Sequence, residues 1–258
     1  MSSKVALDKD TKKRLDDFRS TVHKAAEDIV FKTFPNKVRS VCPSELQKLI
    51  DSTYESSSPF HLSHAPKSTD TTVYPAPVPS SEPEPKKRKL ESGDAVNGVT
   101  HTDAKHAKHP GKMVSNQHIV ALHDQLKREC ETLAELCDKV KLWINLSMPK
   151  IEDGDNFGVQ IQEDCLSELH RSQESAYNLR DAARQDYLTR AKICSKVMKY
   201  PHLEDYQLAL KEHDEKQLYV ARQNLHDLRS IYAVLMDILH KNIEKIRSPK
   251  GNNSSSMY

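Results

Sequence analysis

The distribution of glycine constrains the fold of this chain more than any other feature. The sequence has 258 residues and only six glycines, and none of them falls in 112–153 or 159–250. Two of the six, Gly154 and Gly158, lie four residues apart between these long stretches. Glycine adopts positive φ without strain, so this spacing predicts a tight, shaped loop over 149–161. Pro149 ends the helix before the loop.

The glycine-free stretches carry apolar residues at steps of three and four, the period of an amphipathic helix. We expect the first helix to end at Phe34-Pro35, and Ser115 to be the N-cap of the second. Tyr200-Pro201 separates the last two helices. The expected ranges are 8–34 with a short helical piece over 36–50, 115–147, 161–199 and 203–247.

Helices of similar length joined by short turns pack antiparallel. The sequence therefore predicts an all-α fold, an elongated antiparallel four-helix bundle closed by the first helix. A second, partial apolar stripe indicates that copies of the bundle associate side by side. The expected organisation is an N-terminal helical region over 1–55, a linker over 56–112 and a C-terminal three-helix region over 113–258.

Proline marks the linker, since eight of the thirteen prolines fall between 59 and 110. Such a segment buries too little apolar surface to offset the entropy of ordering, and we expect it to be disordered. It contains the basic cluster Lys86, Lys87, Arg88 and Lys89. An accessible basic cluster favours a nuclear import signal, with a solvated charge run as the alternative. Nucleic-acid binding is disfavoured, because the net charge is only +2 and no aromatic residues interrupt the cluster.

The five cysteines are scattered, with no Cys-x-x-Cys pair, so neither a disulfide framework nor a zinc site is expected. Cys130 and Cys137 fall on an apolar helix face and are expected in the core, with Trp143 as an interhelical anchor. The acidic residues of the loop lack the spacing of a calcium site. No catalytic motif, phosphate-binding loop, signal peptide or membrane-spanning run is found, so we expect no catalytic residue, metal, cofactor or membrane contact.

From its residues alone, the loop is most simply an ordinary turn between helices. However, Pro149–Gln162, Val140–Trp143, Lys199–His202 and Leu239–Ile246 together resemble the proteasome activator REG (11S) family. The basic cluster makes the chain most similar to the nuclear, gamma-type members. The chain departs from the usual family loop at Asp155, where Asn is common, and at Lys150, where Arg is common.

The resemblance implies a homo-heptameric ring with a central channel, which caps the proteasome core particle without ATP and is not an enzyme. It implies that the tail docks on outer-ring subunits of the core particle and that the loop opens the gate to protein and peptide substrates passing through the channel. It also implies a nuclear location, with the cytoplasm as a second compartment. The activation loop would be Lys150, Ile151, Glu152, Asp153, Gly154, Asp155, Asn156, Phe157 and Gly158, and the docking tail Ser255, Ser256, Met257 and Tyr258.

Two other classes of function stay open at this point. The first is a nuclear helical scaffold or adaptor that does not activate the proteasome. The second is a nucleic-acid-binding coiled-coil protein, which would bind DNA in a salt-sensitive manner.

Overall fold

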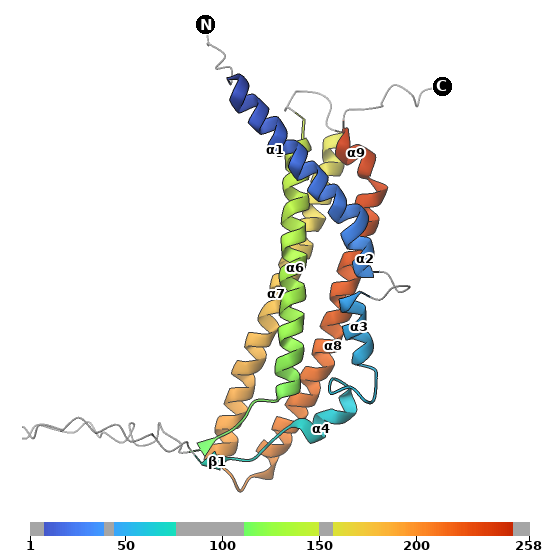
Figure 1. Ribbon diagram of the computed structural model, residues 1–258. Coiled ribbons are helices and arrows are strands. Elements are labelled where there is room, and N and C mark those ends of the chain that lie inside the picture. The colour runs from blue at the N-terminus through green and yellow to red at the C-terminus, as the bar shows by residue number, and fades with distance from the viewer. Residues whose placement is uncertain (1–7, 39–43, 76–110, 150–156, 250–258) are drawn as a thin grey trace, which may run out of the picture.

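Three long helices form the body of the protein. The computed structural model describes residues 8–38, 44–75, 111–149 and 157–249 (Figure 1). Helices α6 (Gln117–Ser147), α7 (Phe157–Lys199) and α8 (Glu204–Lys241) have 31, 43 and 38 residues. At 1.5 Å per residue they are about 46, 65 and 57 Å long. Helix α7 runs antiparallel to both of the others (Figure 1). The predicted all-α bundle is confirmed.

A broken series of short elements takes the place of the fourth helix. Helix α1 crosses α6, and the pieces that follow descend along α8 (Figure 1). The series consists of α1 (Lys9–Asp28), the π-helix η1 (Ile29–Thr33), α2 (Phe34–Val38), α3 (Glu45–Ser52), the 3₁₀-helix η2 (Leu62–His64) and α4 (Ala65–Ser68).

The prediction that Phe34-Pro35 ends the first helix is wrong, because the chain remains helical from Lys9 to Val38. The backbone N–H of Phe34 bonds to the carbonyl of Ile29, five residues earlier, which is the hydrogen bond of a π-helix. Proline lacks an N–H and clashes with the carbonyl of a regular helix. A π turn just before Pro35 changes the hydrogen-bond register there, so the chain passes the proline without ending its helix.

The prediction of a disordered linker from residue 56 is wrong for 56–75. This segment contains η2, α4 and strand β1 (Tyr74–Pro75), which pairs antiparallel with β2 (Gly111–Lys112). Ala65 is fully buried against α8, and Thr69 bonds to a carboxylate on that helix. Composition misses these contacts because they join residues far apart in the sequence. The rest of the expected linker, 76–110, lies outside the described residues.

Gly111 leaves room for a neighbouring side chain where the two strands meet. A Cβ atom at this position would lie 2.4 Å from Cγ1 of Val73, far inside van der Waals contact. Any other residue would therefore force the side chain of Val73 to shift.

The core follows the apolar stripe that was predicted for α6. Cys130, Cys137 and Trp143 are at most 1% exposed. Burial raises the pKa of both thiols to about 12, so they are protonated apolar side chains of the core. The buried residues of α6 at this helical spacing are Ile119, Leu122, Leu126, Cys130, Leu133, Leu136, Cys137, Val140, Trp143 and Ile144.

Three helix ends differ from their predicted positions. Asn116, not Ser115, is the N-cap of α6, and its Oδ1 accepts from the N–H groups of His118 and Ile119. Helix α7 begins at Phe157 and not at 161, so Gly158 lies in its first turn and not in a loop. The last helix breaks at Asn242, whose Nδ2 donates to the carbonyl of Ile238 and competes with the helical hydrogen bond.

Candidate functional site

One end of the bundle, which we call the loop end, brings together the two segments predicted to carry function. It is the end at which α6 ends at Ser147, α7 begins at Phe157 and the short helix α9 (Ile243–Arg247) ends (Figure 1). The predicted activation loop joins the first two of these helices, and the predicted docking tail follows the third. The loop and tail therefore leave the described structure at the same end of the molecule.

Most residues of the predicted site lie outside the described residues. This applies to Lys150–Asn156 of the loop, to the tail residues Ser255–Tyr258 and to the basic cluster Lys86–Lys89. Phe157 and Gly158 are the first two residues of α7. Glycine is costly in a helix interior, but the first helical turn has unpaired N–H groups in any case, so a helix start tolerates it. The regular spacing of apolar residues is weak over the first residues of α7. The sequence pattern therefore predicted a later start for this helix.

Gln162 joins the beginning of α7 to α9. Its side chain is fully buried, and its Nε2 donates to the carbonyl of Ile246 at 2.9 Å. Ile246 is itself fully buried. Within the described part of the chain, Oε1 of Gln162 has no hydrogen-bond partner. Together with the packing of Ile246, this bond holds α9 against the helix that follows the loop.

A chain of polar contacts links the end of α6 to α9 through α1. The indole Nε1 of Trp143 donates to Nδ1 of His23 at 2.8 Å. An indole N–H only donates, so Nδ1 must accept and the proton of the neutral ring is on Nε2. That nitrogen lies 3.2 Å from Oε1 of Glu27, and the same oxygen accepts from Nε of Arg247 at 2.7 Å. The order of contacts is Trp143, His23, Glu27 and Arg247.

The π-helix provides a further contact with the end of α8. The ring of His240 bonds through Nε2 to the carbonyl of Val30 at 2.8 Å, and it packs on Phe31 with 5.1 Å between ring centroids. The guanidinium of Arg247 lies over the ring of Phe31, 5.6 Å from its centroid. Contacts from α1 and η1 thus position Arg247, the last residue of α9.

The opposite end, which we call the hairpin end, contains β1, β2 and the turn between α7 and α8 (Figure 1). Near it, Asp214 of α8 is fully buried and accepts from Nε of Arg190 at 2.9 Å. The hydroxyl of Thr69 and Nδ2 of Asn116 also donate to this carboxylate, at 2.8 and 3.2 Å. The pairing of Arg190 with Asp214 compensates for the loss of hydration of both charges.

A second buried carboxylate lies nearby. Asp186 accepts from Nε2 of His123 at 3.2 Å and from Nε2 of His213 at 2.7 Å, and its side chain is 1% exposed. Burial raises the pKa of Asp186, but the hydrogen bonds from the two histidines outweigh it and hold this pKa below its usual range. Neither cluster was predicted from the sequence. The available signal was the set of charged residues, Asp186, Arg190 and Asp214, on otherwise core-facing helix positions.

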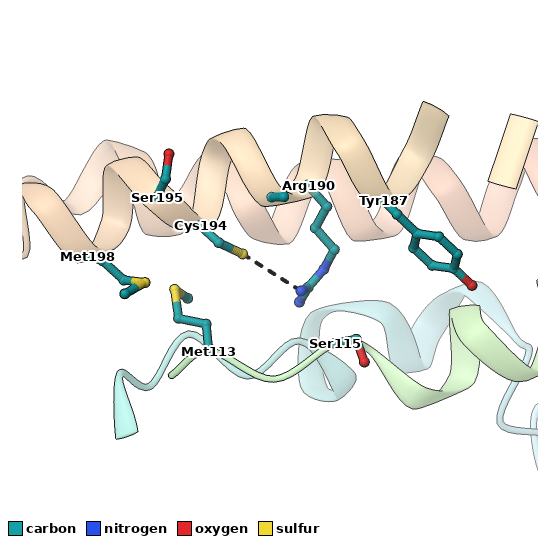
Figure 2. Close-up of a pocket in the computed structure, with 8 residues that line it drawn as sticks. Met113, Ser115, Tyr187, Arg190, Cys194, Ser195 and Met198 are labelled. Atoms are coloured by element: carbon teal, nitrogen blue, oxygen red, sulfur yellow. Dashed lines mark hydrogen bonds between the residues drawn. The ribbon is translucent and has the colours of Figure 1, made fainter. Parts of the chain in front are cut away.

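A cavity of about 330 Å³ opens beside these clusters, between α7 and the segment before α6 (Figure 2). Arg190 donates to Sγ of Cys194 at 3.7 Å along one wall, and Met113 faces them from the other segment. Burial raises the pKa of Cys194, and Asp214 already neutralises Arg190. The cavity therefore offers neither a reactive thiolate nor an uncompensated charge.

The described ranges contain neither a recognisable cluster of metal ligands nor a membrane-spanning helix. Within them, no cluster of three or more His, Cys, Asp or Glu side chains has the arrangement of a metal site. The helices there are also not long and apolar enough to cross a bilayer.

Comparison with known proteins identifies the family. The family model "Proteasome activator PA28, C-terminal" matches residues 112–256, and "Proteasome activator PA28, N-terminal" matches 9–54. The chain is 35% identical over 258 residues to proteasome activator complex subunit 3 of Gallus gallus, with all of both chains covered. It is 34% identical to the subunit of the same name from Homo sapiens, again over the full length of both.

A solved structure shares the arrangement of the helices. The 11S subunit of the Plasmodium falciparum proteasome, PA28, is 30% identical, with 97% of this chain and 99% of that chain covered and a TM-score of 0.68. The family models, the full-length relatives and this structure agree. The chain belongs to the proteasome activator PA28 family.

Proposed function

We propose that this chain is a non-catalytic, ATP-independent activator subunit of the proteasome. It caps the core particle, docks through Ser255–Tyr258 and opens the gate with the activation loop Lys150–Gly158, which stimulates peptide hydrolysis. The observation that carries the proposal is the loop end, where the loop and the tail both leave the same end of a rigid bundle (Figure 1). A single docking surface can therefore be contacted by both segments at once.

The subunit acts as a homo-heptameric ring around a channel that admits protein and peptide substrates. A single short tail loses conformational entropy when it docks, so it binds weakly alone. Several tails on one ring gain about 10²–10⁴ in avidity. A ligand shifts a conformational equilibrium only by its difference in affinity for the two states. The loops supply that difference by contacting the open form of the gate in preference to the closed form.

The cluster Lys86–Lys89 directs the subunit to the nucleus. Its sequence context is rich in proline and poor in apolar residues, as an accessible import signal requires. Replacing all four residues with alanine is expected to move a fluorescent fusion protein to the cytoplasm. Nuclear retention of the variant would contradict this part of the proposal.

Activation is tested by mixing the purified protein with proteasome core particle and fluorogenic peptides. The wild type is expected to increase hydrolysis and to run as a heptamer in native mass measurement. Unchanged hydrolysis would instead favour the scaffold or adaptor function. Retention on DNA that weakens with salt would favour the nucleic-acid-binding class.

Two variants separate docking from gate opening. Deleting Ser255–Tyr258, or replacing these residues with four alanines to keep the length, is expected to abolish capping and leave the ring intact. Gly154→Pro is expected to retain binding and lose activation, with Gly98→Pro outside the loop as its matched control. Full activation by the truncated chain would contradict docking by the tail.

A further inference from the structure

We infer that Gln162 is a positioning residue that couples docking of the tail to the placement of the activation loop. The inference rests on the proposed function and names a residue outside both the loop and the tail. Gln162 lies in the second turn of α7, the helix that the loop enters, and bonds to α9, the helix that the tail leaves. Its side-chain bond is a direct hydrogen bond between the two helices.

The chemistry of this position argues against a role in packing alone. Gln162 is fully buried in a place where an apolar side chain would cost less, because burying an amide requires hydrogen bonds to compensate. Its Oε1 is unpaired within the described residues, so it obtains only part of that compensation. The bond from Nε2 to the carbonyl of Ile246 is therefore the interaction that favours an amide at this position.

The carbonyl of Ile246 needs such a donor. It belongs to the last turn of α9, and the last four carbonyls of a helix have no partner within the helix. Gln162 caps this carbonyl and so fixes the end of α9 to the beginning of α7. Any displacement of α9 when the tail docks must either move α7 or break this bond.

The contacts of Arg247 provide a parallel connection to α6. Through Glu27 and His23 they reach Trp143, which lies one turn before the end of that helix. The base of the tail is thereby connected to both helices that flank the loop. Gln162 is the buried half of this connection, and Glu27, at 26% exposed, is the solvent-accessible half.

Gln173 offers a matched control on the same helix. It is 6% exposed, and its Nε2 donates to the carbonyl of Ala134 at 3.1 Å. Its Oε1 accepts from Lys141. Gln173 thus makes the same kind of bond between helices, but in the middle of the bundle and away from α9.

The test compares Gln162→Met with Gln173→Met in the full-length protein. Methionine retains the length of the side chain and removes the donor. Gln162→Met is expected to lower maximal stimulation of peptide hydrolysis about 5-fold or more, the lower range of typical coupling between sites. The concentration of activator that half-saturates the core particle should be unchanged, since the tail itself is intact. Gln173→Met should keep the wild-type maximum.

A second variant, Glu27→Gln, removes the charge from the exposed half of the connection and so weakens it, with little risk to folding. It is expected to lower maximal stimulation in the same direction and to a smaller extent. Wild-type maxima for both Gln162→Met and Glu27→Gln would overturn the inference. A higher half-saturating concentration with an unchanged maximum would also overturn it, because that result would assign Gln162 to docking alone.

Amide hydrogen exchange in the free protein separates this inference from the proposed function. Gln162→Met is expected to speed exchange in α9, and Gln173→Met is not. If the wild type fails to stimulate the core particle but this difference is found, the proposed function is wrong and the connection between α7 and α9 stands. If the wild type stimulates and α9 exchanges equally in all three proteins, the inference is wrong and the proposed function stands.

Discussion

The two ends of the bundle are held together by different kinds of interaction. At the hairpin end, the charges of Asp186, Arg190 and Asp214 are buried and satisfied by several donors or acceptors. At the loop end, the connections are single neutral hydrogen bonds and the partly exposed pair of Glu27 with Arg247. Breaking a buried charge pair costs far more than breaking an exposed one. The polar contacts therefore make the loop end easier to adjust than the hairpin end.

The difference between the two ends predicts the largest loss of stability for a variant of Asp214, at the centre of the buried charges of the hairpin end. Asp214→Ala leaves Arg190 buried without its counter-charge and removes the acceptor of Thr69 and Asn116. We expect a loss of about 3–5 kcal/mol in the free energy of unfolding, measured by denaturant titration. The exposed Asp205→Ala on the same helix should change it by less than about 0.5 kcal/mol. Similar losses in the two variants would remove the contrast between the ends.

Asp186 makes the free energy of unfolding depend on pH. Because the pKa of Asp186 is held below its usual range in the folded state, its stabilising effect is complete above its unfolded pKa. The effect is lost as pH falls through the lower, folded pKa. Asp186→Asn should cost about 1.5–3 kcal/mol near neutral pH, the value of hydrogen bonds to a charged group.

The same variant should lose less stability than the wild type when the pH is lowered below about 4, the unfolded pKa of Asp. Thermal unfolding measured across this range checks the difference. Asp181→Asn, an exposed position on the same helix, is the control. Parallel curves for the wild type and Asp186→Asn would exclude Asp186 as a source of acid sensitivity.

A smaller effect is predicted at Trp143. Trp143→Phe keeps an aromatic ring in the core and removes the N–H that holds His23 in its tautomer. We expect a loss of about 1–2 kcal/mol in the free energy of unfolding, from one hydrogen bond and a small change of volume. Calorimetry of Trp143→Phe and of the neighbouring exposed Leu142→Ala measures it. Equal values for the two would indicate that the indole N–H contributes nothing.

The smallest effect on stability is expected for Glu27→Gln. The pair of Glu27 with Arg247 is partly exposed, and such pairs contribute about 0–1 kcal/mol. Its neighbour Asp28→Asn, which breaks an exposed pair with Lys32, is the control for charge. A near-native melting temperature together with reduced stimulation of the proteasome would distinguish Glu27 from Asp214. A large loss of stability for Glu27→Gln would show that the loop end is not the adjustable one.

Much of the helical framework could be predicted from local patterns. The spacing of apolar residues in α6 predicted which face of the helix is buried, including Cys130, Cys137 and Trp143. This was possible because the helical period places residues three and four positions apart on the same face. The ends of the helices were less accurate. Asn116 replaced Ser115 as the N-cap, since both residue types cap helices and only the tertiary position of the chain decides between them.

The candidate site was predicted as sequence positions and not as an arrangement in space. The loop was predicted from its glycines and the docking tail from the family resemblance, but the bond from Gln162 to Ile246 joins positions 84 residues apart. Similarly, Thr69 and Asp214 are 145 residues apart, and their contact ordered a segment that its composition had assigned to a disordered linker. Periodicity and composition are local signals, so they cannot register such pairs.

By itself, the sequence determined that this protein is a set of long helices, because helix formation depends on the spacing of residues a few positions apart. Only the tertiary structure decided that the helix continues through Pro35, that 56–75 packs on α8, and that α9 is held against the start of α7. The last two of these features arise from buried polar groups whose partners lie far along the chain. Their energies depend on which groups meet, and that is fixed only when the bundle is assembled.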